Sequence, residues 1–131
     1  MPFFNKKILI VDDDSSIREI FSLMLEMEGF IVSQAEHGKQ AIDILNTLTS
    51  EEYPNCILLD LMMPVMSGSE FLSLMKVDYS NSFEKIPVIV CSGYGECIKT
   101  KQIVATLVKP VDLTALFQTI EKAINSEFQV N

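Results

Sequence analysis

The stretch CILLDLMMP, residues 56–64, is an apolar run that ends at a single acid, Asp60, and passes into a methionine-rich loop. Other runs of this apolar character are ILIV (8–11), IPVIVCS (86–92) and ATLVK (105–109), with a weaker one at FIVSQA (30–35). Continuous apolar runs of this length are typical of strands covered on both faces, as in a parallel sheet. The sequence therefore predicts five parallel strands and places Asp60 at the end of one of them.

Between these runs the apolar residues change to helical spacing. Two segments follow the i, i+3, i+4, i+7 pattern of an amphipathic helix. The first contains Ile17, Ile20, Phe21 and Met24, and the second contains Leu113, Leu116, Phe117 and Ile120. Further helices are expected over 39–48 and 69–77. Strand and helix thus alternate along the chain, which is typical of a doubly wound α/β sheet with helices on both faces.

Local signals mark both ends of the first predicted helix. Asp14 and Ser15 are suitable N-cap residues, and Gly29 is a suitable stop. Asp14 and Arg18 are also spaced for an i,i+4 ion pair on this helix. These signals predict a helix that starts beside the acidic run DDD at 12–14.

Length and charge limit the class of protein. At 131 residues, with no internal repeat or linker, the chain is predicted to form a single domain over 1–131, with a core over about 6–125. Eighteen acids against ten bases give a formal charge of −8, which would repel nucleic acid and anionic membranes. We therefore expect no direct contact with either.

The cellular compartment is predicted from cysteines and apolar segments. Cys56, Cys91 and Cys97 are odd in number and lack metal-ligand spacing, which favours a reducing compartment. No apolar segment reaches the eighteen or so residues that span a bilayer, and MPFFNKK has no signal-peptide core. These observations predict a cytoplasmic protein.

Polar side chains follow the apolar runs at the predicted carboxyl ends of four strands. They are Asp12, Asp13 and Asp14 after the first strand, then Asp60, Ser92 and Lys109. Ligands of open α/β sheets bind beyond these carboxyl ends, so the side chains are expected to converge. Carboxylates held close together repel by roughly 1 kcal/mol per pair in water and about 4 kcal/mol at an effective dielectric near 20. A cation must therefore hold them ionised.

The chemistry of this group indicates phosphoryl transfer with Mg²⁺. Mg²⁺ prefers oxygen ligands and is commonly held by one or two carboxylates together with phosphate oxygens. The Lys109 amine would help to neutralise a phosphoryl group in its transition state, while one carboxylate attacks phosphorus. Asp60 is the natural nucleophile because it stands alone at its strand end.

In these segments the chain resembles the receiver domains of bacterial two-component response regulators, in which an aspartate accepts a phosphoryl group from a phosphohistidine. The resemblance covers nearly the whole chain. It is carried by ILIVDDDSSIR (8–18), CILLDLMMPVMSG (56–68), VIVCSG (88–93) and LVKP (107–110). It implies a sheet in the order 2-1-3-4-5, a histidine kinase or histidine phosphotransfer protein as donor, and a switch rather than a turnover enzyme.

The resemblance also implies a role for each site residue. Asp12, Asp13 and Asp60 would bind Mg²⁺ together with the backbone carbonyl of Met62, whereas Asp14 would lie outside this set. Asp60 would be phosphorylated, and both Ser92 and Lys109 would contact the phosphoryl group. The peptide bond between Lys109 and Pro110 would be cis.

The chain departs from the family pattern in three ways. Only sixteen residues, 93–108, separate Ser92 from Lys109, which predicts a shortened fourth helix. Thr106 stands where the family usually has an aromatic switch residue, which predicts weakened coupling to Ser92. Met62 and Tyr94 offer no carboxylate or amide to hold a hydrolytic water, which predicts slow self-dephosphorylation.

Two other functions are compatible with the same residues. A small Mg²⁺-dependent phosphatase with an aspartyl nucleophile would carry its label on Asp12 rather than Asp60. A non-phosphorylated pseudo-receiver scaffold would keep the acidic pocket and take no label at Asp60. The downstream partner and the oligomeric state do not follow from the sequence.

Overall fold

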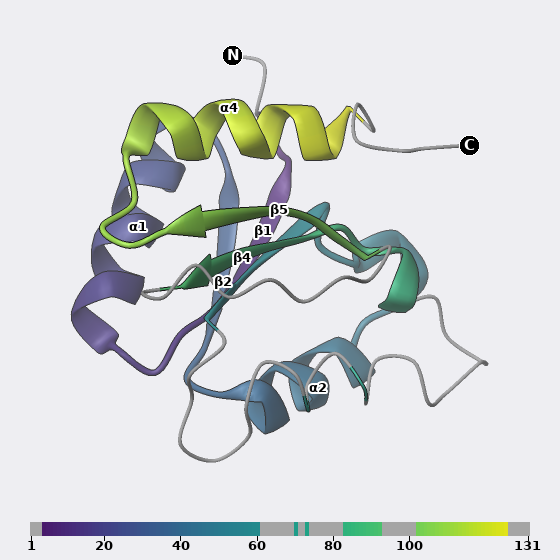
Figure 1. Ribbon diagram of the computed structural model, residues 1–131. Coiled ribbons are helices and arrows are strands. Elements are labelled where there is room, and N and C mark those ends of the chain that lie inside the picture. Colours follow the sequence, from purple (N-terminus) through teal and green to yellow (C-terminus); the bar gives the residue numbers. More distant parts are fainter. Residues whose placement is uncertain (1–3, 61–69, 71–72, 74–82, 93–101, 126–131) are drawn as a thin grey trace.

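The computed structural model describes residues 4–60, 70, 73, 83–92 and 102–125. Its five strands form one parallel sheet in the order β2-β1-β3-β4-β5 (Figure 1). The strands are β1 (Lys7–Val11), β2 (Ile31–Ala35), β3 (Cys56–Asp60), β4 (Val88–Ser92) and β5 (Ile103–Val108). The predicted parallel sheet and strand order are confirmed, and β5 begins two residues earlier than its apolar pattern indicated.

Helices cover both faces of the sheet, as predicted. They are α1 (Ser15–Met27), α2 (Gly38–Asn46) and α4 (Leu113–Ile124), with short 3-10 turns η1 (Ser50–Glu52) and η2 (Phe83–Lys85). Helices α1 and α4 lie on one face, and α2 lies on the other (Figure 1). None of the described helices is long and apolar enough to cross a membrane.

Two predicted helices fall mainly outside the described residues. Within the helix expected over 69–77, only Glu70 and Ser73 are described, and both are helical. The shortened fourth helix was predicted after Ser92, and residues 93–101 lie outside the described part of the chain.

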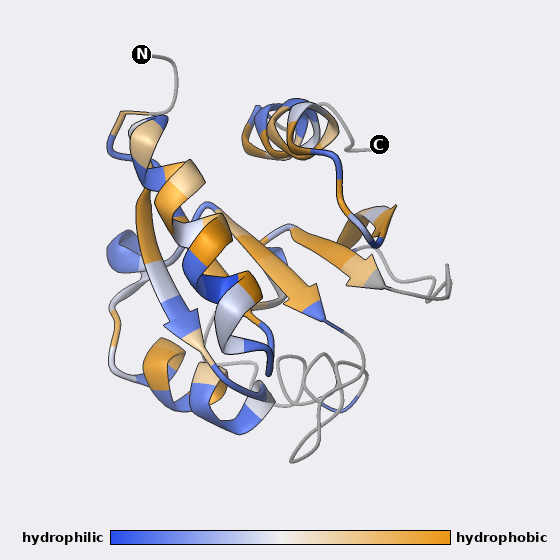
Figure 2. Ribbon diagram, turned by 90° about the vertical axis from the view of Figure 1, so that its left-hand side faces the viewer, coloured by the Kyte–Doolittle hydropathy of each residue, from blue (hydrophilic) through white to orange (hydrophobic). Residues whose placement is uncertain are grey.

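The two halves of the core follow from the alternation of side chains along the central strands. Leu9 and Val11 of β1 pack with Leu45 of α2, whereas Ile8 and Ile10 pack with the other two helices. All five residues of β3 are buried, as expected for the central strand of a covered sheet. Truncating one of these large side chains to alanine would cost about 2–5 kcal/mol. The apolar strands are visible in Figure 2.

Helix α1 begins and ends at the predicted residues, but its buried face differs. Asp14 is the N-cap, and Gly29 follows the helix with a positive φ of 101°, where glycine has no Cβ penalty. The buried residues of α1 are Arg18, Ser22 and Leu25, whereas Ile20 is 54% exposed. The expectation that Ile20 faces the core is therefore wrong, because α1 turns the face that carries Arg18 toward the sheet.

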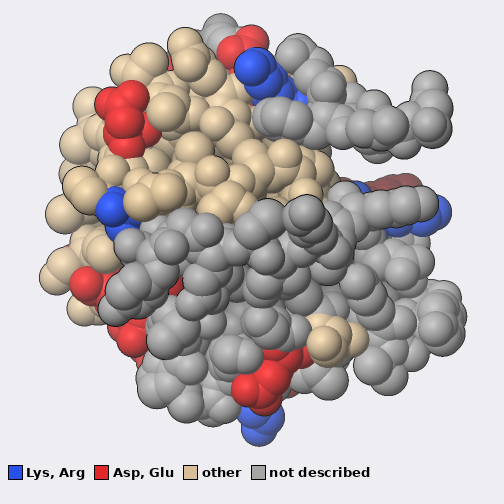
Figure 3. Space-filling model, viewed as in Figure 1, with Lys and Arg blue, Asp and Glu red and all other residues tan. Residues whose placement is uncertain are grey.

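Strand β5 forms one edge of the sheet. Thr106 and Val108 are exposed on it, and Val108 has 56% of its surface accessible. Figure 3 shows that uncharged residues make up most of the described surface around β5 and α4. The weakened coupling inferred from Thr106 remains a prediction.

A buried glutamine, which no sequence motif marks, holds the start of β5 by hydrogen bonds. Gln102 is 6% exposed, and its Nε2 donates to the carbonyls of Phe83 (2.8 Å) and Ile86 (3.0 Å). The backbone carbonyl of Gln102 accepts from the Val88 amide at 2.8 Å. Gln102 thus joins the turn η2 to the beginnings of β4 and β5.

Candidate functional site

Three aspartates meet at the carboxyl rim of the sheet. Asp12 and Asp13 follow β1, and Asp60 is the last residue of β3. The two strands are neighbours in register, with Val11 opposite Leu59, so the chain presents their next residues at the same edge. Each of the three acids offers a carboxylate oxygen, and these oxygens lie within 4.8 Å of one another. We call Asp12, Asp13 and Asp60 the acidic cluster.

Burial differs within the acidic cluster. Asp12 and Asp60 are 4% and 7% exposed, whereas Asp13 is exposed to solvent. Asp12 and Asp60 are thus buried at the ends of their strands, whereas Asp13 lies on the solvent-exposed side of the cluster. The position at a strand end gives Asp60 a fixed backbone and sets its carboxylate beside Asp12 and Asp13.

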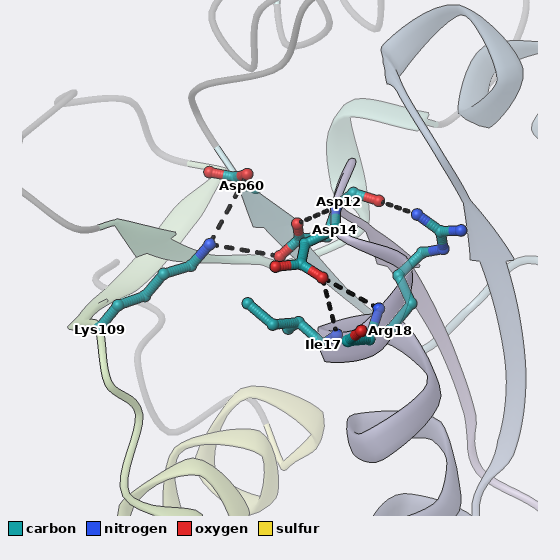
Figure 4. Close-up of polar contacts among 7 residues, drawn as sticks. Asp12, Asp14, Ile17, Arg18, Asp60 and Lys109 are labelled. Atoms are coloured by element: carbon teal, nitrogen blue, oxygen red, sulfur yellow. Dashed lines mark hydrogen bonds and ion pairs between the residues drawn. The ribbon is translucent and has the colours of Figure 1, made fainter.

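Lys109 points into the acidic cluster from the far side of β4 (Figure 4). Its Nζ lies 3.3 Å from Asp12 Oδ2 and 3.6 Å from Asp60 Oδ2. Partial burial on its own would lower the pKa of Lys109, but the charges of Asp12 and Asp60 outweigh it and raise the pKa above its usual value. The ammonium therefore stays charged. The peptide bond between Lys109 and Pro110 is cis, as predicted.

Asp14 has a different task from its two neighbours. Its side chain accepts hydrogen bonds from the amides of Ser16 (2.9 Å) and Ile17 (3.3 Å), which caps α1 (Figure 4). Its own amide donates to Asp12 Oδ1 at 2.9 Å. The helix start thus supports the acidic cluster, and Asp14 lies outside it, as expected.

Arg18 reaches back from α1 to the same loop. Its guanidinium donates to the backbone carbonyl of Asp12 at 2.6 Å and lies 3.9 Å from Glu36 Oε1. The predicted pair between Asp14 and Arg18 is therefore wrong, because Asp14 is engaged as a helix cap. One signal could have revealed this arginine: it shares the i, i+4, i+7 face of α1 with Ser22 and Leu25.

Three further residues named in the predictions are described only in part or not at all. Ser92 ends β4, where Cys91 pairs with Asp60 and Ser92 pairs with Val108. Its backbone therefore lies on the rim between the strands that carry Asp60 and Lys109, while its side chain is outside the described atoms. Met62 and Tyr94 lie outside the described residues.

The donor set of the acidic cluster suits a hard divalent cation. All three ligand atoms are carboxylate oxygens, which Mg²⁺ prefers over nitrogen or sulfur. Among the described residues, the ammonium of Lys109 is the positive group paired with these acids, and it does not balance three carboxylates. An oxygen-ligated cation at this rim is therefore compatible with both the chemistry and the charge.

The model of the response regulator receiver domain family matches residues 8–121. The chain is a response regulator receiver domain. This receiver is 37% identical over 123 residues to sporulation initiation phosphotransferase F of Bacillus subtilis, an alignment covering 90% of the chain and 93% of that protein. It is also 37% identical over 91 residues to the phosphate regulon transcriptional regulatory protein PhoB of Klebsiella pneumoniae, covering 70% of the chain but 37% of that protein.

Solved structures support the same family. The receiver domain protein of Clostridium thermocellum superposes with a TM-score of 0.77 at 26% identity, covering 93% of this receiver and 96% of that chain. Chemotaxis protein CheY4 of Vibrio cholerae gives 0.76 at 27% identity, covering 91% and 98%. The receiver thus spans nearly all of some relatives and, in PhoB, about a third of a longer protein.

Proposed function

We propose that this receiver accepts a phosphoryl group on Asp60 from a phosphohistidine of a histidine kinase or phosphotransfer protein and then signals by protein contact. The observation that carries the proposal is the position of Asp60, which stands at the end of a fully buried strand with Lys109 Nζ 3.6 Å from its Oδ2. A carboxylate with a rigid mount and a cation beside it is suited to nucleophilic attack on phosphorus.

The transfer assigns a task to each residue of the rim. A carboxylate oxygen of Asp60 forms the new P–O bond, the P–N bond of the donor breaks, and its electron pair remains on the imidazole. Lys109 contacts the phosphoryl oxygens through its ammonium, and Ser92 donates its hydroxyl to one of them. These contacts stabilise the negative charge on the three non-bridging phosphoryl oxygens in the transition state.

Mg²⁺ is the proposed cofactor, held by Asp12, Asp13, Asp60 and the Met62 carbonyl. When bound, Mg²⁺ neutralises charge on the phosphoryl oxygens and on the clustered carboxylates. The support for this assignment is the acidic cluster itself, whose oxygens lie within 4.8 Å of one another.

The donor is proposed to be a protein because an apolar stripe lies on the helix beside the site. Ile20, Leu23 and Met27 on the outer face of α1 are 54%, 57% and 68% exposed. The stripe lies on the helix that starts at the N-cap Asp14, whose amide donates to Asp12 of the acidic cluster. Exposed apolar side chains in such a row favour contact with another protein. The formal charge of −8 supports a partner other than nucleic acid.

The proposed product is a signalling state and not a released metabolite, which makes the receiver a switch rather than a turnover enzyme. A cytoplasmic location is proposed with it, and the reduced thiols of Cys56 and Cys91 agree with that compartment.

Labelling with a small phosphodonor tests the proposal. The receiver should bind beryllofluoride and take one acyl phosphate in the presence of Mg²⁺, with the label mapped to Asp60 by mass spectrometry. Asp60→Asn should abolish both, while Asp43→Asn, which removes an exposed charge on α2, should leave them unchanged. Label on Asp12 would favour the phosphatase, and absence of label would favour the scaffold.

A further inference from the structure

Arg18 is a buried arginine whose contacts the proposed chemistry leaves unused. The residue is 9% exposed, although arginine side chains are usually solvated. Its guanidinium donates to the Asp12 carbonyl at 2.6 Å and lies 3.9 Å from the carboxylate of Glu36, which is largely exposed (Figure 4 shows the contact with Asp12). Burying a charge costs free energy unless the charge is paired and hydrogen-bonded, so these two contacts account for how Arg18 is tolerated at this position.

The contact completes the polar bonding of Asp12. The backbone amide of Asp12 donates to the carbonyl of Ala35 at 3.1 Å. Its Oδ1 accepts from the Asp14 amide, and its Oδ2 faces the Lys109 ammonium. The remaining acceptor is the backbone carbonyl, which receives Arg18. Each polar group of Asp12 is therefore fixed by a different part of the chain.

Fixing the Asp12 carbonyl also fixes the peptide plane that leads into Asp13. Among the described residues, the Asp13 side chain makes no hydrogen bond or ion pair, and it is exposed. Its position in the acidic cluster therefore depends on the backbone that carries it. Arg18 is the side chain that anchors this backbone, and Glu36, just after β2, provides a second contact for the guanidinium.

We propose that Arg18 is a positioning residue, which holds the Asp12–Asp13 peptide so that both carboxylates face Asp60 in the geometry that binds the divalent cation. This inference rests on the proposed function, because it deepens the account of the same site. Groups that orient metal ligands typically change metal affinity by 10–100-fold when they are removed.

The sign of the effect separates positioning from simple electrostatics. Removing a positive charge near a cation site should strengthen cation binding if charge alone matters. Loss of positioning should weaken it. Arg18→Met therefore gives opposite expectations under the two explanations, and Arg18→Lys keeps the charge while losing the planar guanidinium fork.

Calorimetric titration with Mg²⁺ on the whole chain provides the test. We expect Arg18→Met to weaken the Kd about tenfold, Arg18→Lys to weaken it by a smaller factor, and Lys122→Met, a charge-matched exposed control on α4, to leave it unchanged. In EDTA, amide hydrogen exchange at Asp13 and Asp14 should be faster in both Arg18 variants than in wild type.

The outcomes distinguish this inference from the proposed function. Unchanged or tighter Mg²⁺ binding by Arg18→Met, with wild type binding normally, overturns the positioning role. Should Arg18→Met fail to fold, Arg18→Lys decides by the same two measurements. If wild type binds no Mg²⁺, the proposed function fails, and unchanged exchange in EDTA would then also overturn the anchoring of the loop by Arg18.

Discussion

The Nζ of Lys109 lies 3.3 Å from Oδ2 of Asp12, so the ammonium is placed against one of the acids proposed to bind the metal. The same nitrogen is 3.6 Å from Asp60 Oδ2. Lys109 therefore has two effects on the site. It relieves repulsion among the carboxylates when no divalent cation is bound, and it opposes the arrival of that cation.

Replacing Lys109 by methionine should separate these effects. We expect Mg²⁺ to bind several-fold more tightly to Lys109→Met, because a positive charge close to the cation site is gone. In EDTA the free energy of unfolding should fall by about 1–3 kcal/mol, since the buried carboxylates lose a hydrogen-bond donor. Calorimetry and urea unfolding measure the two quantities. Weaker Mg²⁺ binding would show that Lys109 organises the acidic cluster more than it repels the cation.

Removal of the metal should lower stability in a way that depends on Asp60. At a Mg²⁺ concentration ten times the Kd, binding to the folded state alone adds about 1.4 kcal/mol to the free energy of unfolding. Chelation with EDTA should remove this increment from wild type. In Asp60→Asn the increment should shrink sharply, because one of the three ligands has lost its charge. Urea unfolding with and without Mg²⁺ measures it, and an equal increment in both proteins would place the cation elsewhere.

An acid placed in the exposed stripe of α1 should impair transfer from a protein donor only. Leu23→Asp changes a residue that is 57% exposed, so stability should stay within about 0.5 kcal/mol. The rate of transfer from a phosphorylated histidine protein should fall at least about tenfold, equivalent to roughly 1.4 kcal/mol of lost contact. Labelling by a small phosphodonor should be unchanged.

A control for that experiment is Phe4→Asp, which changes an apolar residue that is 66% exposed and lies outside α1. It should leave both rates as in wild type. Equal loss with the small donor and the protein donor in Leu23→Asp would mean that the stripe supports the site itself and not the docking of a partner.

Alkaline pH should destabilise the protein through Cys91. Burial raises the pKa of this thiol to about 12, against the opposing charge of Lys109. The thiol of the unfolded chain has a pKa of about 8.5, so above that pH the unfolded state has lost a proton that the folded state still holds. The stability that the protonated Cys91 thiol contributes is fully present below about pH 8.5 and is lost as the pH rises toward 12. The free energy of unfolding falls by at most about 1.4 kcal/mol per pH unit in this range.

Urea unfolding between pH 8 and pH 11 measures this loss, and Cys91→Val is the control. The variant should lose stability less steeply than wild type, although other groups titrate in both proteins. Parallel curves would contradict the assignment of the effect to Cys91.

The strand ends of the site could be predicted from the sequence because each lies beside an apolar run with one clear boundary. Asp12 and Asp60 follow such runs, and parallel strands bring their carboxyl ends to one edge. Arg18 could not be assigned in this way, because the i,i+4 spacing to Asp14 and the buried face of α1 were competing signals. In the structure Asp14 caps the helix, and Arg18 lies on the buried face of α1, where it donates to the Asp12 carbonyl.

Ile20 shows the same limit of periodicity. Apolar spacing alone favours the face with Ile17 and Ile20, but the core accepts Phe21 and Leu25 and leaves Ile20 exposed. A helix with apolar residues on more than one face can be rotated without changing its pattern. Only packing against β1 and β2 selects one rotation.

Gln102 could not be singled out from the sequence, because a buried amide side chain leaves no periodic pattern. Its contacts in the structure show that it stabilises the fold. Its Nε2 donates to Phe83 and Ile86 carbonyls at 2.8 and 3.0 Å. Gln102→Ala removes this donor from both acceptors and should lower the free energy of unfolding by about 1–3 kcal/mol. Gln34→Ala, at an exposed position of β2, should change it by less than about 0.5 kcal/mol.

The same variant tests whether the start of β5 and the acidic cluster are independent. Gln102 precedes β5, whereas Lys109 follows it, so the two lie at opposite ends of one strand. Mg²⁺ affinity in Gln102→Ala should therefore equal that of wild type even where stability has fallen. A loss of affinity as large as the loss of stability would mean that the turn η2 and β5 transmit strain along the strand to Lys109, and it would make Gln102 part of the support of the site.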